Sequence, residues 1–128
     1  DTGTNTSYNQ TITSTHFRSA HQESDANANL SYAADQDQAQ ATGFQNLAYA
    51  LGGNNDESIA GFLHIFDPSN STFVKHFTGN FQSIAHSNRI NNQYPTGYFN
   101  TTTALDQFIF KFSSGNIDAG TIKMYGIK

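Results

Sequence analysis

The clearest pattern in the sequence is an alternation of aromatic and other residues near its carboxyl-terminal end. Within Asp106–Phe112, phenylalanines recur at every second position, as Phe108, Phe110 and Phe112. A period of two places side chains on one face of a strand. The pattern therefore predicts a strand over this range, with the three phenylalanine rings buried on one face.

A second strand is expected to return alongside the first. The turn-forming residues Ser113–Asn116 follow the phenylalanine pattern, and Thr121–Ile127 is rich in residues that favour strands. Alternation places Ile122 and Met124 on the same side of this second strand. The two segments together predict a hairpin at the end of the chain.

Two β-rich segments in the middle of the chain are separated by turn formers. Ser58–Phe66 is mostly apolar, which is typical of a central strand covered on both faces. Asp67–Asn70 predicts a turn. Thr72–Ile84 predicts a second, longer strand in which Gly79 marks a bulge or bend.

The remaining segments give weaker patterns. Tyr94–Thr102, with a proline near its start, predicts a shorter strand toward the edge of a sheet. Tyr8–Phe17 alternates weakly, and His21–Gln40 is polar enough to predict an extended surface loop. Gly43–Leu51 matches either a strand or a short helical turn, of which we favour the strand.

Short strands separated by turns, without a long amphipathic helix, predict an all-β fold. We expect a two-sheet antiparallel sandwich of the jelly-roll type. The length of 128 residues fits a single domain, residues 1–128. The first residue is Asp1 rather than methionine, and we expect the chain to be the carboxyl-terminal part of a longer protein.

Composition narrows the classes of partner. Only 12% of the residues are charged, against about a quarter in a typical soluble protein, so the surface is expected to form hydrogen bonds rather than ion pairs. A net charge of -4 with six Lys and Arg argues against nucleic acid as a partner. No apolar run approaches the roughly 20 residues that cross a bilayer, so no membrane insertion is expected. Without cysteine, the chain forms no disulfide and no thiolate metal site.

The five histidines are candidate metal ligands. The combinations to consider are His16 with His21, and His64 with His76 and His86. Neither spacing is diagnostic of a zinc site, because no placed carboxylate completes either set. Asp35–Asp37 resembles part of a calcium loop but lacks the glycine and the distal glutamate of that motif. We therefore predict no metal and no cofactor.

The sequence contains no recognisable catalytic signature. Carboxylates that could in principle flank a glycosidic bond are Asp25, Asp56, Glu57, Asp67 and Asp106, but no pattern pairs them. The sequence has no nucleophile elbow and no phosphate-binding glycine loop. We therefore predict a protein that is not an enzyme. Aromatic side chains that could contact a glycan or a protein partner are Tyr32, Tyr49, Tyr94 and Tyr98.

The second half of the chain resembles a family of tailed-phage virion proteins. The resemblance rests on an ordered series of motifs: Phe62–Thr72, Val74–Phe77, Ser113–Asn116 and Gly120–Lys128. Members of the family end in a strand of the form Leu/Met-Tyr-Gly-Ile/Val-Lys. The match covers about the last half of the chain.

The resemblance implies a jelly-roll-like domain that serves particle architecture and has no catalytic residues. It also implies further strands before Asp1, so the sandwich is expected to lack its first strands here. The function expected is that of a virion structural protein, a tail fibre or a capsid decoration. Its partners would be other virion proteins and copies of itself, in a trimer or a lattice. The alternative is a receptor-binding or glycan-binding module at a fibre tip, which contacts host surface glycans.

Overall fold

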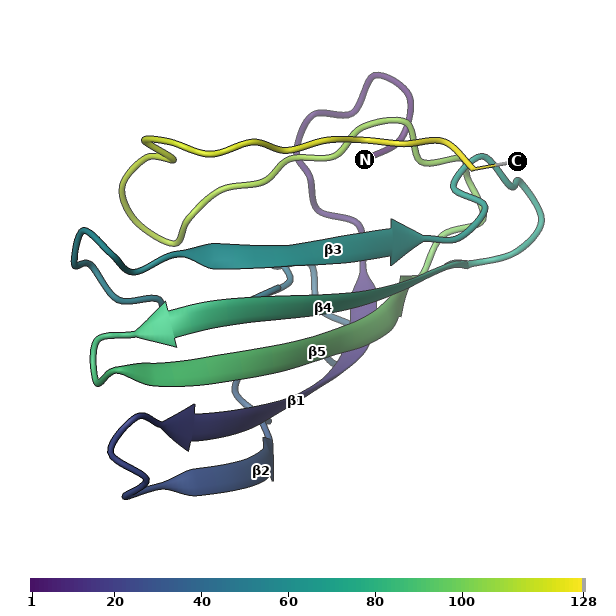
Figure 1. The fold of residues 1–128 in the computed structure, drawn as a ribbon. Coiled ribbons are helices and arrows are strands. Elements are labelled where there is room, and N and C mark those ends of the chain that lie inside the picture. Colours follow the sequence, from purple (N-terminus) through teal and green to yellow (C-terminus); the bar gives the residue numbers. More distant parts are fainter. Residues whose placement is uncertain (128) are drawn as a thin grey trace.

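The computed structural model describes residues 1–127, and it is all-β, as the sequence predicts. The strands are β1 Ile12–Gln22, β2 Ala28–Tyr32, β3 Ile59–Ile65, β4 Lys75–Ala85 and β5 Arg89–Phe99. They form one open antiparallel sheet of five strands in the order β2-β1-β5-β4-β3 (Figure 1). One sheet, rather than the two of a sandwich, is formed by the residues described. Lys128, the last residue of the sequence motif Gly120–Lys128, lies outside them.

Two tight turns connect the strands at one end of the sheet. Between β1 and β2, the Gln22 N–H donates to the Asn27 carbonyl at 2.9 Å, and Asp25 has a positive φ of 58°. Between β4 and β5, Asn88 has a φ of 50°. Asn and Asp adopt this left-handed conformation more readily than most residues. The Glu23 N–H donates to the Asn88 carbonyl at 3.0 Å, so the two turns lie side by side.

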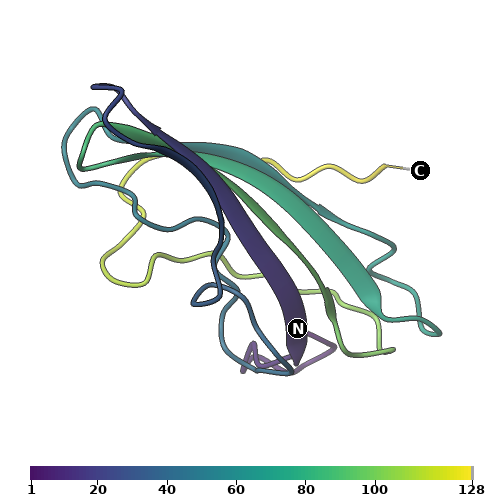
Figure 2. The ribbon, with the colours of Figure 1, turned by 90° about the horizontal axis from the view of Figure 1, so that it is seen from below.

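One face of the sheet is covered by irregular chain. The segment between β2 and β3 passes along this side, as Figure 2 shows, and we call this side the covered face. The buried apolar side chains of the fold are Ile12, Ala20, Ala33, Phe77, Ala85 and Leu105. Buried polar strand residues are Ser14, His16, Lys75, Ser83, Asn91 and Gln93. The core is therefore thin and unusually polar, and its polar groups need internal partners.

The apolar run at Ser58–Phe66 does form a strand, β3, but its predicted position is wrong. β3 pairs only with β4 and is the outer strand of the sheet, with most of its residues exposed. An apolar run shows that both faces suit burial, but it does not show which neighbours the strand has. Gly79 forms no bulge, because the register between β3 and β4 is constant on both sides of it.

The expectation of a short edge strand at Tyr94–Thr102 is also wrong. β5 is 11 residues long and lies in the middle of the sheet, between β1 and β4. Its Pro95 is fully buried. The pairing between β4 and β5 passes from Thr78–Thr96 to Phe81–Gln93, without paired residues opposite Pro95 and Tyr94. Proline has no N–H to donate, so the sheet accommodates it by an interruption of the ladder rather than by an edge position.

The predicted terminal hairpin is absent from the described residues. Asp106–Phe112 and Thr121–Ile127 form no strand. Phe108, Phe110 and Phe112 are 37%, 43% and 38% exposed, so the prediction that they are buried on one face is wrong. Alternation creates a strand only where a neighbour supplies hydrogen bonds, and neither segment has such a neighbour here.

The first half of the chain differs from prediction in detail. Weak alternation at Tyr8–Phe17 marks the beginning of β1, which continues to Gln22. The polar stretch His21–Gln40, expected to be a loop, contains β2. Gly43–Leu51 forms neither a strand nor a helix, and it lies against the covered face. These segments take their conformation from what they pack against, so local pattern identifies them poorly.

Candidate functional site

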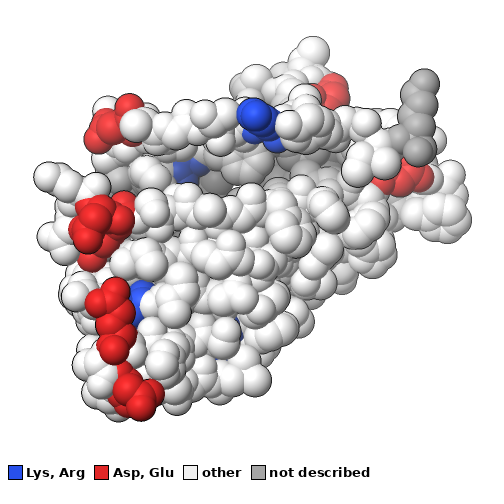
Figure 3. Space-filling model, in the orientation of Figure 1, with Lys and Arg blue, Asp and Glu red and all other residues white. Residues whose placement is uncertain are grey.

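The second face of the sheet is not covered by the coil between β2 and β3, and we call it the open face. It carries every second residue of each strand, beginning with Thr13 on β1, Ala28 on β2, Ala60 on β3, His76 on β4 and Ile90 on β5. None of these positions in the five described strands is Lys, Arg, Asp or Glu. Figure 3 shows this side: the surface over the strands is almost free of charged atoms, and acidic groups gather at the strand ends.

Three aromatic residues form a row across β2, β1 and β5. Phe17 is in register with Tyr32 on one side and with Tyr94 on the other. The Phe17 and Tyr94 rings are stacked, with centroids 4.7 Å apart and planes at 17°. Phe17 is 42% exposed and Tyr32 is 57% exposed. This aromatic row is an apolar surface that faces solvent.

The outer end of the aromatic row is fixed by a hydrogen bond. The Tyr32 hydroxyl donates to the carboxylate of Asp37, in the coil that follows β2. This hydrogen bond is the main cause that raises the pKa of the Tyr32 hydroxyl. The bond to Asp37 thus fixes the position of the Tyr32 side chain at the end of the aromatic row.

Next to the aromatic row lies a cluster of amides on β4 and β5. Asn80 donates to the side-chain oxygen of Asn92 at 2.6 Å, and Gln82 donates to the same oxygen at 3.0 Å. Asn92 in turn donates to the Tyr94 hydroxyl. These residues are partly exposed. The amide cluster, Asn80, Gln82 and Asn92, therefore offers further neutral donors and acceptors next to an aromatic ring.

A second group of rings lies on β3 and just beyond it. Phe62 and His64 have centroids 5.0 Å apart, and His64 meets Phe66 edge-on at 6.4 Å. Phe62 is in register with Asn80 of the amide cluster. The open face thus carries an aromatic row, an amide cluster and the β3 rings in sequence across the sheet.

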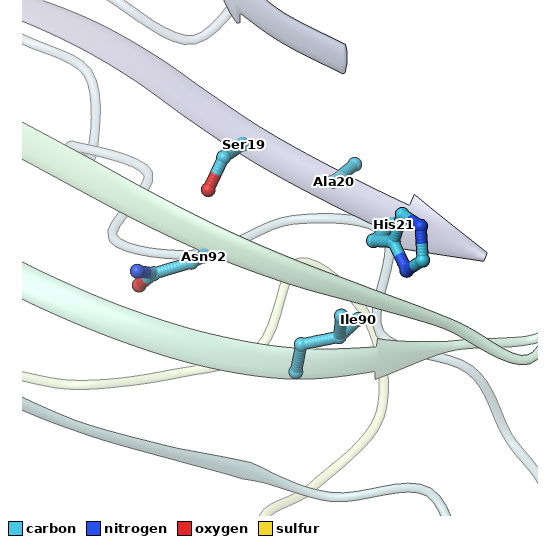
Figure 4. A pocket seen from close by; sticks show the side chains of 5 residues that line it. All are labelled: Ser19, Ala20, His21, Ile90 and Asn92. Carbon is cyan, nitrogen blue, oxygen red and sulfur yellow. The ribbon is translucent and has the colours of Figure 1, made fainter. Parts of the chain in front are cut away.

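A shallow depression of about 110 Å³ lies at one end of the open face, between β1 and β5 (Figure 4). Its lining residues are Ser19, Ala20, His21, Ile90 and Asn92. The depression is small compared with the roughly 300–1,000 Å³ of typical ligand pockets. The open face is therefore a broad surface with a shallow depression rather than an enclosed cavity.

Three of the tyrosines identified from the sequence share this face. Tyr32 and Tyr94 belong to the aromatic row, and Tyr98 is tilted against His76 at 6.1 Å. Tyr49 lies apart from them, against the covered face, where its ring meets His16 edge-on at 5.6 Å. Burial raises the pKa of the Tyr49 hydroxyl.

Sequence reasoning missed Phe17, Phe62 and the amide cluster. The sequence around Phe17 alternates, but this local pattern does not show which residues of other strands lie beside Phe17. The register of β1 with both β2 and β5 brings the aromatic row together.

The histidines considered as metal ligands are separated. His16 is buried on the covered face, whereas His21 points to the open face and contacts Asp25 at 3.0 Å. His64 is in register with Thr78 rather than with His76, and His86 lies in the turn between β4 and β5. No group of three His, Asp or Glu side chains suited to a metal ion occurs within residues 1–127.

The carboxylates considered for catalysis bind groups close to them in the fold. Glu57 accepts from the Asn54 side chain at 3.1 Å, Asp67 from the Asn70 side chain at 2.7 Å, and Asp106 from the Gly3 N–H at 3.1 Å. Asp56 lies beside Glu57 in the loop before β3.

Residues 1–127 contain no helix with the length and apolar character needed to cross a bilayer. Comparisons of the chain with protein-family models, with curated proteins and with solved structures gave no match.

Proposed function

We propose that this chain is a non-enzymatic structural protein of a bacteriophage particle, a tail fibre or a capsid decoration, that acts through protein–protein assembly. The observation that carries the proposal is the open face: exposed aromatic rings on a sheet surface without charged side chains. The resemblance of the second half of the chain to virion proteins supports the particle as its location.

The chemistry of the open face favours a protein partner. The solvent-facing side of an antiparallel sheet usually carries polar and charged residues. The open face differs because it carries aromatic rings and no charged strand residue. Burying the rings of the aromatic row removes apolar area from water, and no ionic group on the strands has to be desolvated with them. The amides already bind one another, so their burial leaves few unsatisfied groups.

Assembly would also complete the predicted architecture. Two sheets pack face to face at about 10 Å, with side chains of both inner faces between them. A partner sheet on the open face would turn the single sheet into a two-sheet sandwich of the jelly-roll type. The partner would be another copy of this chain or another virion protein. Identical chains close through rotational symmetry, and fibres commonly use three-fold axes, so we expect a trimer, with a lattice as the next case.

The size of the particle that the full chain forms in solution tests this proposal. Sedimentation at micromolar concentration should give a trimer or a larger assembly for the natural chain. The double variant Phe17→Lys, Phe62→Lys should be monomeric, because it places two charges on the open face. Phe73→Lys is the matched control: Phe73 is 69% exposed but lies in the loop between β3 and β4. A natural chain that is monomeric, and that occupies isolated sites in an image of the particle, would refute the proposal.

A glycan-binding module is the second candidate, and one observation favours it. The partly exposed ring of Tyr94 lies next to the neutral donors and acceptors of the amide cluster. A sugar presents an apolar face that stacks on an aromatic ring, and hydroxyls that pair with amides. If the chain is a glycan-binding module, it should bind a defined set of sugars on a glycan array. The variant Tyr94→Ala should lose this binding, and the control Phe73→Ala should keep it. An array without any bound sugar would eliminate it.

A further inference from the structure

The outer edge of β3 carries backbone groups that have no partner among residues 1–127. The Phe66 N–H donates to the His76 carbonyl at 2.9 Å, and the Ile84 N–H donates to the Ser58 carbonyl at 3.1 Å. In an antiparallel pair, every second residue of a strand bonds to the neighbouring strand. The even-numbered residues of β3 therefore face β4.

The odd-numbered residues of β3 point their backbone groups away from the sheet. These residues are Ile59, Gly61, Leu63 and Ile65. No group within residues 1–127 forms a hydrogen bond with their outward N–H or C=O groups. The edge is thus ready to accept another strand.

Nothing in the sequence of β3 protects this edge. Natural sheets guard outer strands with charged residues, proline, bulges or a covering segment. The seven residues of β3 include no Lys, Arg, Asp, Glu or Pro, and the strand has no bulge. Such an edge, long and apolar, is where strands from other chains add.

The chain also contains a segment suited to this edge. Thr121–Ile127 has the seven-residue length of β3 and the composition of a strand, yet it forms none here. Its apolar side chains face solvent: Ile122 is 67% exposed, Met124 is 89% exposed, and Tyr125 is 75% exposed. Its backbone forms no hydrogen bond with other groups of the described chain.

Direction indicates which copy supplies the segment. In Figure 1 the last residues, drawn in yellow, run past the outer side of β3 in the same direction as that strand. Pairing within one copy would therefore be parallel, whereas every pairing in this sheet is antiparallel. A second copy can present the segment in the antiparallel direction, which is slightly more stable per residue.

We propose that Thr121–Ile127 of one copy adds as an antiparallel strand to the outer edge of β3 in a second copy. This inference rests on the proposed role in assembly, and it names one contact by which copies join. The donor segment and the acceptor edge are different surfaces, so the contact closes as a reciprocal pair or as a ring such as a trimer.

Variants of the full chain that remove N–H donors test the acceptor edge. Ile59→Pro with Ile65→Pro removes two outward N–H groups and leaves the hydrogen bonds to β4 in place. Ile59→Ala with Ile65→Ala is the matched control, which loses the same side chains but keeps both donors. We expect sedimentation to show assembly at least about tenfold weaker for the proline variant than for the alanine variant. A melting curve for each variant verifies that both are folded.

The donor segment is tested in the same way. Ile122→Pro with Lys123→Pro should also weaken assembly, and Ile122→Ala with Lys123→Ala should weaken it less. A synthetic peptide with the sequence of residues 121–128 should compete with the segment and dissociate assemblies of the natural chain. Proline and alanine variants that assemble equally at either site would overturn the inference.

The outcomes separate this inference from the proposed function. If the proline variants assemble normally while Phe17→Lys with Phe62→Lys is monomeric, assembly through the open face stands and strand addition fails. If the natural chain is monomeric, both fail. A monomer whose outward N–H groups on β3 are protected from hydrogen exchange would show that the segment pairs within its own copy, which also overturns the exchange between copies.

Discussion

Gln93 on β5 binds both backbone groups of Tyr49. The Tyr49 N–H donates to the side-chain oxygen of Gln93 at 2.8 Å, and the Gln93 amide donates to the Tyr49 carbonyl at 3.1 Å. The same amide donates to the Ser83 hydroxyl at 3.0 Å. A single fully buried side chain thus attaches the coil before β3 to two central strands.

Gln93→Leu should destabilise the fold by about 2–4 kcal/mol. The variant leaves the Tyr49 N–H without a partner, and the Tyr49 carbonyl and the Ser83 hydroxyl keep only the long hydrogen bond of 3.4 Å that joins them. A buried unsatisfied group costs about 1–3 kcal/mol. Urea denaturation measures the change. The neighbouring Asn92→Leu is the control: its side chain also forms hydrogen bonds, but its partners on the open face are partly exposed and can bond to water instead. The expected loss is below about 1 kcal/mol. Equal losses for the two variants would contradict the role assigned to Gln93.

Stability should fall as the solution becomes acidic, because of His16. Burial is the main cause that lowers the pKa of His16 below its ordinary value of 6.5, and it outweighs the opposite effect of nearby groups, such as the Asp35 carboxylate. The unfolded chain therefore binds the proton more readily than the folded one. The contribution of neutral, buried His16 to the free energy of unfolding is fully present above pH 6.5. It is lost as the pH falls below that value, at up to about 1.4 kcal/mol per pH unit.

The pH dependence is checked by urea denaturation between about pH 8 and about pH 5. His16→Leu should flatten the decline in the free energy of unfolding. His64→Leu, at an exposed position on β3, should leave the decline as it is. If the free energy of unfolding of both variants falls with pH as it does in the natural chain, His16 does not cause the pH dependence.

Phe77→Ala should cost about 3–5 kcal/mol, the usual loss for a buried phenylalanine. Phe77 is 3% exposed, and its ring is 5.3 Å from that of Phe99. Phe110→Ala, by contrast, should cost less than about 1 kcal/mol, because Phe110 is not part of this core. Thermal or urea unfolding of the two variants compares them directly, and a larger loss for Phe110→Ala would mean that the terminal segment is buried in solution.

Gly97→Ala should destabilise the sheet by about 1–3 kcal/mol, as overpacking does. An added Cβ at Gly97 would lie 2.4 Å from the Thr13 carbonyl oxygen and 2.9 Å from the Phe77 ring. Gly53→Ala is the control, since nothing lies within 4 Å of a Cβ at that position. Melting temperatures of the two variants should differ by several degrees, and equal values would contradict close packing of β1 against β5.

Removal of metal ions should leave the melting temperature and the state of assembly unchanged. His16 and His21 lie on opposite faces of β1, and His64 and His76 are not in register. Sedimentation and thermal melting with and without a chelator measure both quantities. A substantial fall in the melting temperature would show that the protein holds a structural metal.

The sequence alone determined the fold class and the location of several strands. A mostly apolar run and a longer β-rich segment, with turn formers between them, identify β3 and β4, because apolar and β-branched side chains suit the surfaces of a sheet. The low charge of the chain likewise sets the character of the open face: with few ionic residues available, the solvent side of the strands is built from rings, amides and hydroxyls. These are local properties, and they need no knowledge of neighbours.

Only the tertiary structure decided which strands are neighbours and which face is open. Pro95 indicated an edge strand, yet β5 is central, because its other residues pair on both sides. Phe108, Phe110 and Phe112 alternate as a strand should, yet they form none, since no strand among residues 1–127 pairs with their backbone. The aromatic row likewise depends on the register of Phe17 with Tyr32 and Tyr94. Strand pairing brings together residues far apart in the chain. A local pattern therefore predicts that a segment can form a strand, but it does not predict which strand lies beside it.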